Sequence, residues 1–290
     1  MLAKLKQITR EQQAYGTEKL ALAGIEYDDG TIQGVNEHIP GGGGESSWIE
    51  SIPEMHRNIF RGQSLGSSVT AAQLAAIEDG SFEGLYVGDY WTIPVTIDNT
   101  PVNINWRIAD MNYIVGAVNH LVIVPDTGLY QTWYYTSPST GYANSLMHTG
   151  KATAEAIVAQ AFPDIVLTHT EYLTTSGAAD YTRDLYECTV EAMNAAMIYG
   201  HYGMYQIDGS TDFPSNRIAE GVPITQLALF KLARKFIPAA NASSLYGYWI
   251  SDSYSDDVGI AVGENGGMQT APRNGNHFHR PYFLIGISEE

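Results

Sequence analysis

The sequence contains one cysteine, few basic residues and no long apolar run, and each shortage excludes a class of protein. The lone Cys188 cannot form an internal disulfide, so folding in a reducing cytoplasm is expected. Lys and Arg total 15 against 32 Asp and Glu, a formal net charge of −17, which argues against nucleic acid or an anionic membrane as partner. No run of about 20 apolar residues predicts a membrane-spanning helix, and we expect no signal peptide.

The chain is rich instead in residues that bind through rings and hydrogen bonds. Its 290 residues include 29 glycines and 19 tyrosines, whereas charged residues make up only 16%. Hydrophobic residues make up 44%, which is enough to bury a core and excludes a wholly disordered chain. This composition is typical of β-rich adhesins and viral structural proteins.

The first 47 residues predict a helix followed by a linker. Across residues 1–23, apolar side chains recur at helical spacing, and Leu2, Leu5 and Ile8 form the face that we expect to dock onto a partner. The alternative is a solvated terminal helix. Residues 24–47 include four consecutive glycines, typical of a flexible linker. These glycines do not predict a phosphate loop, because no strand precedes them and no Lys-Ser/Thr pair follows.

Residues 48–290 predict one globular α+β domain. Helices are expected over residues 70–80, 152–162, 181–199 and 225–235, the first of them capped by Thr70 with Gln73. A hairpin turn is expected at residues 98–101. Strands are expected over residues 85–93, 95–97, 102–109, 121–124, 165–167, 248–250, 258–262 and 282–287. This β–α–β order favours an α+β fold over a doubly wound sheet.

One short pattern is that of a serine hydrolase. The segment GQSLG at residues 62–66 matches Gly-x-Ser-x-Gly and would make Ser64 the nucleophile. That motif requires a buried strand directly before it and a helix directly after it. Here the helix is expected only from residue 70, so we interpret Ser64 as a loop serine and predict no enzyme activity.

Two further patterns suggest metal binding, and neither is complete. His277 and His279 alternate along an expected strand and could begin a zinc site, but no third ligand lies near them in the sequence. Asp252, Asp256 and Asp257 could bind calcium, but the EF-hand order is absent. We therefore expect no metal and no cofactor.

Six segments of the domain form a series: GDYWTI at 88–93, NWRIAD at 105–110, HLVIVPD at 120–126, LTHTEYL at 167–173, YWIS at 248–251 and HRPYFLI at 279–285. This series resembles a family of domains encoded by phages and prophages of Gram-positive bacteria. The family shares a GDYWxI…WRIA opening, a YWLRS block and a closing RPxFxI, and its fold is similar to that of C-type lectins. The resemblance extends over about residues 48–287.

The resemblance implies a C-type-lectin-like domain with inserted helices. Trp91 and Trp106 are suited to fill a core between hairpin strands, and Arg107 is expected to form an ion pair with an acidic neighbour. The strand after Arg280 is expected to pair beside the first strand. The chain departs from the family where Ser251 replaces the usual arginine. The calcium motif of sugar-binding lectins and the nucleophilic cysteine of the sulfatase-modifying relatives have no counterpart.

The resemblance also implies a non-enzymatic bacteriophage virion protein: a head fibre, a capsid decoration protein or a tail adhesin. Such a protein is made in the host cytoplasm and assembled into the virion. Its N-terminal arm would bind capsid or tail proteins, the domain would face host-surface glycans or proteins, and copies would associate as a homo-oligomer. The alternatives are a soluble carbohydrate-binding module and an enzyme on the same fold.

The expected ligand surface lies in the irregular segment of residues 251–279. Glycines there alternate with side chains that offer hydrogen bonds and stacking rings, a mixture that holds sugars and peptide loops. The alternative is a loop without a ligand. The residues expected to form the surface are Asp252, Tyr254, Asn265, Arg273, Asn274, Asn276 and His277.

Overall fold

The chain divides into two compact units, Met1–Pro53 and Glu54–Glu290. The computed structural model describes residues 60–133, 142–174, 183–200, 225–243, 245–255, 258–272 and 274–288, with three short strands in the first unit. These strands are β1 (Lys4–Leu5), β2 (Ile25–Glu26) and β3 (Ile32–Gln33), paired antiparallel in that order.

The described part of the first unit differs from the sequence expectation. Lys4–Leu5 was expected within a helix, but it is a strand because its backbone pairs with Ile25–Glu26. β2 and β3 likewise lie inside the expected linker. The rest of residues 1–23 and 24–47, including Leu2 and Ile8, lies outside the described residues, as do the glycines at 41–44.

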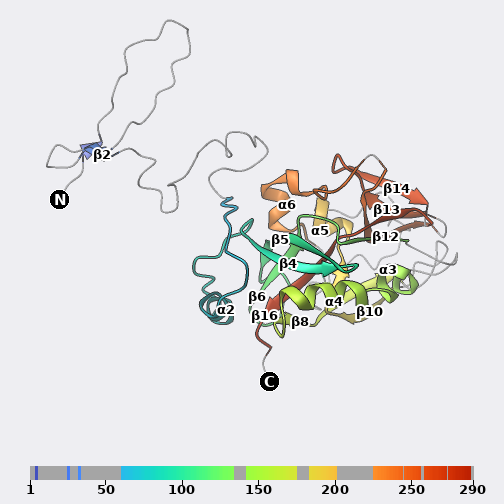
Figure 1. The fold of residues 1–290 in the computed structure, drawn as a ribbon, viewed down its shortest axis with the longest axis horizontal. Coiled ribbons are helices and arrows are strands. Elements are labelled where there is room, and N and C mark those ends of the chain that lie inside the picture. The colour runs from blue at the N-terminus through green and yellow to red at the C-terminus, as the bar shows by residue number, and fades with distance from the viewer. Residues whose placement is uncertain are drawn as a thin grey trace, which may run out of the picture. The chain divides into compact units, whose positions relative to one another are not determined.

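A six-stranded sheet forms the centre of the second unit (Figure 1). Its strands follow the order β11-β16-β6-β5-β4, and β8 pairs with β16 on the same edge as β11. Their bounds are β4 (Tyr90–Ile97), β5 (Thr100–Met111), β6 (His120–Pro125), β8 (Val166–Leu167), β11 (Val190–Ala192) and β16 (Pro281–Gly286). Every residue of β6 and β16 is buried, as expected for strands covered on both faces.

The β4–β5 hairpin fixes the register of this sheet. Asp98 and Asn99 both have positive φ, at 48° and 61°, which is the backbone of a type I′ turn and matches the right-handed twist of the strands. The turn places Trp91 directly opposite Trp106, and both indoles are fully buried. The predicted hairpin and its tryptophan core are therefore confirmed.

Two of the helices that the sequence predicts pack against the core of the central sheet. α2 (Ala71–Glu78) begins at Thr70, whose hydroxyl accepts a hydrogen bond from the Gln73 amide while the Gln73 side chain accepts one from the Thr70 amide. α4 (Ala152–Ala161) contributes Ala154, Ile157 and Val158 to the core that contains both tryptophans. The predicted capping box and the predicted helix over 152–162 are confirmed.

A five-stranded sheet carries the second core of this unit. Its order is β14-β13-β12-β15-β7, in which only β12 and β15 run parallel. Trp249 is fully buried there and packs in one cluster with Tyr142 and Leu173. The strands are β7 (Tyr130–Trp133), β12 (Tyr248–Ser255), β13 (Val258–Val262), β14 (Met268–Pro272) and β15 (Asn276–His279).

The long helix predicted over residues 181–199 is wrong. Residues Arg183–Cys188 form β10, which pairs antiparallel with β9 (His169–Thr174) over six residue pairs, and β11 follows at once. Only α5 (Ala195–Tyr199) is helical, and Asn194 caps it by accepting a hydrogen bond from the Met197 amide. Pairing with β9 and β16 outweighs the four-residue apolar spacing that had suggested a helix.

The position of β16 also corrects an expectation. β16 pairs with β6 and β11 rather than with β4, the first strand of the sheet. Residues 85–89 precede β4 without forming a strand, and the predicted helix over 225–235 is reduced to α6 (Ala228–Leu232) and a 3-10 turn, Arg234–Phe236. The fold is mixed α+β, mostly sheet with few helices, and the central sheet curls. Within the described ranges, no helix combines the length and apolar composition needed to cross a bilayer.

Candidate functional site

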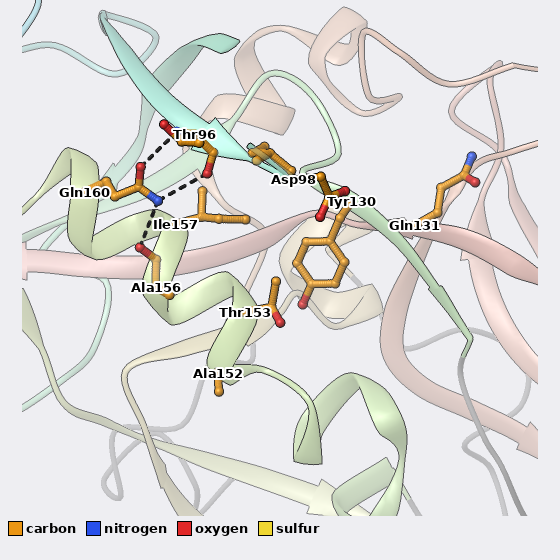
Figure 2. A pocket seen from close by; sticks show the side chains of 10 residues that line it. Thr96, Asp98, Tyr130, Gln131, Ala152, Thr153, Ala156, Ile157 and Gln160 are labelled. Carbon is orange, nitrogen blue, oxygen red and sulfur yellow. Dashed lines mark hydrogen bonds between the residues drawn. The ribbon is translucent and has the colours of Figure 1, made fainter. Parts of the chain in front are cut away.

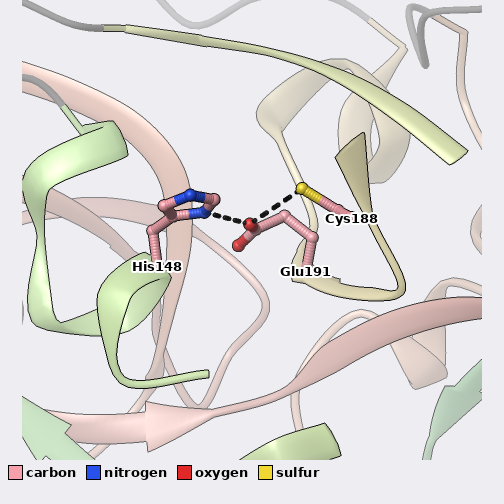
Figure 3. A group of neighbouring side chains, drawn as sticks. All are labelled: His148, Cys188 and Glu191. Atoms are coloured by element: carbon pink, nitrogen blue, oxygen red, sulfur yellow. Dashed lines mark hydrogen bonds and ion pairs between the residues drawn. The ribbon is translucent and has the colours of Figure 1, made fainter. Parts of the chain in front are cut away.

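A buried polar group that we name the Glu191 cluster lies beside the β11–β16 edge of the central sheet. It consists of His148, Cys188 and Glu191, whose nitrogen, sulfur and oxygen atoms all lie within 4.8 Å of one another (Figure 3). His148 comes from α3 (Leu146–Thr149), Cys188 ends β10 and Glu191 is the middle residue of β11. The cluster therefore joins three separate segments of the domain.

Local hydrogen bonds fix the orientation of the His148 and Glu191 side chains. Ser145 caps α3 by accepting a hydrogen bond from the His148 amide, at 3.1 Å, which sets the backbone from which the imidazole projects. Glu191 Oε1 accepts hydrogen bonds from the Tyr142 hydroxyl and from the Ala192 amide. The second oxygen, Oε2, lies 2.6 Å from His148 Nδ1 and accepts from Cys188 Sγ at 3.7 Å (Figure 3).

Two more titratable side chains, His169 and Glu171, lie on the face of the β9–β10 hairpin that carries Cys188. Cys188 is the direct cross-strand partner of His169, and Glu171 follows two residues later on the same face. Both side chains are buried. His169 Nε2 and Glu171 Oε1 are 3.4 Å apart, within ion-pair distance, and neither of these two atoms has a hydrogen-bond partner among the described residues.

Tyr282 connects this face of the hairpin to the sheet. It is the register partner of Glu191 on β16, and its ring lies 5.1 Å from that of His169. Its hydroxyl is a further buried atom that has no hydrogen-bond partner in the part of the chain that the structure describes. Such atoms are costly in a folded protein unless a water or an ion satisfies them.

Burial controls the electrostatics of the cluster. Burial and the charge of Glu191 raise the pKa of Glu171 well above its usual value. Burial would also raise the pKa of Glu191, but hydrogen bonds from His148, Tyr142 and Ala192 outweigh it and lower that pKa. Burial and the two carboxylates raise the pKa of the Cys188 thiol. Cys188 is thus an inaccessible thiol, unlike an activated nucleophile.

The expected ligand surface is only partly exposed. Asp252 is buried and accepts a hydrogen bond from the Ala195 amide at the start of α5, so it supports the fold rather than a ligand. His277 is also buried: its Nδ1 accepts from the Gly247 amide and its ring packs edge-on against Trp249, with centroids 4.4 Å apart. These two residues were wrongly placed on a surface, because the segment forms β12 and β15 instead of one irregular loop.

The other residues of that surface divide between turns and strands. Asn265 is exposed and accepts a hydrogen bond from the Gly267 amide within a turn. Asn274 and Asn276 are exposed. Arg273 lies outside the described residues, as do the Tyr254 side chain, Asp256 and Asp257.

Asn276 belongs to an exposed patch that we name the Trp133 face. Asn276 is the register partner of Trp133, whose side chain is 54% exposed at the outer edge of the five-stranded sheet. Asn276 Nδ2 donates a hydrogen bond to Gln131 Oε1 at 3.0 Å, so the side-chain amides of Asn276 and Gln131 are oriented beside the Trp133 indole. The sequence alone does not indicate Trp133, although its position in a run of tyrosines is an aromatic signal.

A shallow groove of about 520 Å³ opens near this face (Figure 2). Tyr130, Gln131 and Asp98 line it together with residues of α4. Gln160 closes one end, because its side-chain amide bonds both the amide and the carbonyl of Thr96. The groove therefore offers one aromatic ring and several hydrogen-bonding groups.

The remaining catalytic and metal patterns are not assembled as sites. Ser64 is an exposed residue of an isolated bridge to Tyr90, and its hydroxyl accepts from the Gly66 amide instead of pairing with a histidine. His279 shares the buried side of β15 with His277, but it bonds Tyr130 Oη at 2.7 Å. Arg107 does form the predicted ion pair, with Asp126.

Comparisons with protein-family models, with curated proteins and with solved structures found no match to this chain. Function is therefore argued from the fold, the Trp133 face and the Glu191 cluster.

Proposed function

We propose that the protein is a non-enzymatic bacteriophage virion protein, displayed on the capsid or tail, whose C-type-lectin-like unit binds a host-surface glycan. The first unit attaches the protein to the particle and the second presents the Trp133 face outward. Division of the chain into two compact units supports this arrangement, since each can serve a separate partner. The net charge of −17 is suited to display in solution and not to packaging nucleic acid.

The observation that carries the proposal is the exposed indole of Trp133 beside two oriented amides, those of Gln131 and Asn276. A single exposed aromatic side chain is common on protein surfaces, so what distinguishes this indole is the pair of amides held beside it. A sugar ring stacks its apolar face on such an indole while its hydroxyls bond to nearby amides. Gln131 and Asn276 are placed to make those bonds, because their mutual hydrogen bond holds them beside Trp133.

The first experiment measures adsorption of the purified full chain to host cells and to a glycan array. Replacing Trp133 and Asn276 by alanine should weaken binding by about 1–3 kcal/mol, or roughly 5- to 150-fold, with no change in melting temperature. Tyr86→Ala is the matched control, because Tyr86 is an exposed aromatic of the segment before β4, at 48% exposure. Unchanged adsorption of the folded Trp133 variant would rule out this face as the binding surface.

The second experiment tests attachment to the particle. A chain that lacks residues 1–53 should remain folded and should be lost from purified virions, whereas the full chain should co-purify with them. Decoration of virions by the truncated chain at full occupancy would refute attachment through the first unit. A full chain that binds glycans but never co-purifies with virions would favour a soluble carbohydrate-binding module, which the same Trp133 face supports.

A further inference from the structure

We propose that the Glu191 cluster is a structural metal site that holds one zinc ion through His148 Nδ1, Cys188 Sγ and Glu191 Oε2. This inference goes beyond the proposed virion role and does not depend on it. It also departs from the sequence expectation of no metal, because folding alone brings these three residues together.

Two of the three separations in the Glu191 cluster are close to those of a tetrahedral zinc site, and all three ligand atoms lie within 4.8 Å of one another. In a tetrahedral zinc site, bonds of about 2.0–2.3 Å place neighbouring ligand atoms about 3.3–3.7 Å apart. Cys188 Sγ and Glu191 Oε2 already lie 3.7 Å apart. His148 Nδ1 and Glu191 Oε2 are closer, at 2.6 Å, since they bond each other directly. Inserting the ion requires these two atoms to separate by only about 0.7 Å.

The surroundings of Glu191 are those of a metal-binding carboxylate. Tyr142 and the Ala192 amide hold Oε1, which leaves Oε2 directed at His148 and Cys188. Hydrogen bonds of this kind orient the ligands of protein metal sites and tune their affinity.

A second observation supports a cation beside the Glu191 cluster. Glu171 Oε1 is buried on the same hairpin face as Cys188, with no hydrogen-bond partner among the described residues and with His169 Nε2 at 3.4 Å. Glu171 is not one of the three residues whose ligand atoms lie within 4.8 Å of one another, so it reaches the ion through one buried water.

The donor set selects the metal. One sulfur, one imidazole nitrogen and carboxylate oxygen are typical ligands of zinc, whereas calcium and magnesium prefer oxygen alone. With a thiolate and one carboxylate bound, the ligands carry two negative charges, which the zinc ion balances. The ion connects α3, β10 and β11. Because its ligands are largely enclosed, its role is structural and not catalytic.

Metal analysis of the full chain, followed by cobalt substitution, tests the proposal. The protein purified without chelator should contain one zinc per chain, and the zinc-free protein should take up one Co²⁺ with a near-ultraviolet sulfur-to-cobalt charge-transfer band. Cys188→Ser should remove that band, and Glu191→Gln, which removes a ligand, should weaken Co²⁺ binding by more than the roughly 10- to 100-fold that loss of an outer-shell partner costs. His277→Gln is the matched control, since this buried histidine lies outside the cluster, and it should keep the band.

Two outcomes would overturn the proposal. The first is a folded wild-type chain that neither retains zinc nor binds Co²⁺, which would make the cluster a hydrogen-bond network around Glu191. The second is Co²⁺ binding without a sulfur band, or binding that persists unchanged in Cys188→Ser, which would place the ion elsewhere. Should Cys188→Ser fail to fold, the band of the wild-type protein decides the question by itself.

Discussion

Arg107 and Asp126 form a two-point ion pair on the central sheet, with Arg107 Nε 2.7 Å from Asp126 Oδ1 and Nη2 bonded to Oδ2. The guanidinium also donates to the Gly88 carbonyl and lies over the ring of Phe236, 4.0 Å from its centroid. Because both side chains are largely enclosed, the pair joins β5 to the loop after β6 without competition from water.

Removing one member of this pair should cost more than removing both. Arg107→Met leaves an enclosed carboxylate without a partner and should lower the free energy of unfolding by about 3–5 kcal/mol. The double variant Arg107→Met/Asp126→Met should regain part of that loss, as measured by urea unfolding. If the single and double variants lose the same free energy of unfolding, an unpaired Asp126 carboxylate does not destabilise the protein.

Alanine substitutions at Gly88 and Gly84 would distinguish the effect of backbone strain from that of steric crowding. Both have positive φ, at +95° and +74°, but a Cβ at Gly88 would lie 2.1 Å from the Phe60 ring, whereas one at Gly84 would meet no described residue within 4 Å. Gly88→Ala should therefore destabilise the domain by about 2–4 kcal/mol, and Gly84→Ala by about 1 kcal/mol. Thermal unfolding distinguishes the two, and equal melting temperatures would exclude crowding at Phe60.

The capping box of α2 should have a measurable effect at an exposed site. Thr70→Ala removes the acceptor for the Gln73 amide and should destabilise the protein by about 1 kcal/mol. Ser64→Ala is the comparison, because that hydroxyl makes only a 3.3 Å contact with the Gly66 amide in an exposed loop. It should change stability by less than about 0.5 kcal/mol and alter no activity. Chemical denaturation of both variants checks this order.

Buried histidines should make the domain sensitive to acid. Burial lowers the pKa of His279 from 6.5 to about 4, although the charge of Glu191 opposes the shift. The folded state then binds the proton more weakly than the unfolded state, so stability is full above pH 6.5 and is lost as the pH falls towards about 4. The loss from this group is on the order of 3 kcal/mol. Burial also lowers the pKa of His120, which contributes in the same direction.

Urea unfolding at a series of pH values measures this dependence. His279→Gln removes the titrating ring while its amide can still accept a hydrogen bond from Tyr130. The variant should therefore show a shallower decrease in stability between pH 6.5 and about 4 than the wild type. The same slope in both proteins would assign the acid sensitivity to other groups.

Local signals in the sequence predicted the elements that depend on few residues. Thr70 and Gln73 mark a helix start through mutual hydrogen bonds, and the apolar run at 121–124 becomes a strand buried on both faces. Residues 183–192 were not predictable in this way. Leu185, Thr189 and Met193 recur at a helical interval, and only the partners on β9 and β16 decide for strands.

The Glu191 cluster could not be predicted for a related reason. Cys188 and Glu191 are three residues apart, but this spacing is common, and it carries meaning only when α3 brings His148 beside them. Conversely, Asp252 and His277 looked like surface residues because they lie among glycines and asparagines. Their strands turn them inward, where backbone amides of Ala195 and Gly247 bind them.

The place of β16 in the central sheet affects how the chain is made. β6 ends at Pro125, yet it lacks one of its two neighbours until Pro281–Gly286 is available to pair with it. During synthesis, the apolar edge of β6 therefore stays unpaired until the residues between β6 and β16 have been added. An unpaired apolar edge of this kind favours chaperone binding. A chain interrupted before residue 281 lacks the strand that pairs with β6, β8 and β11, so it cannot complete the central sheet.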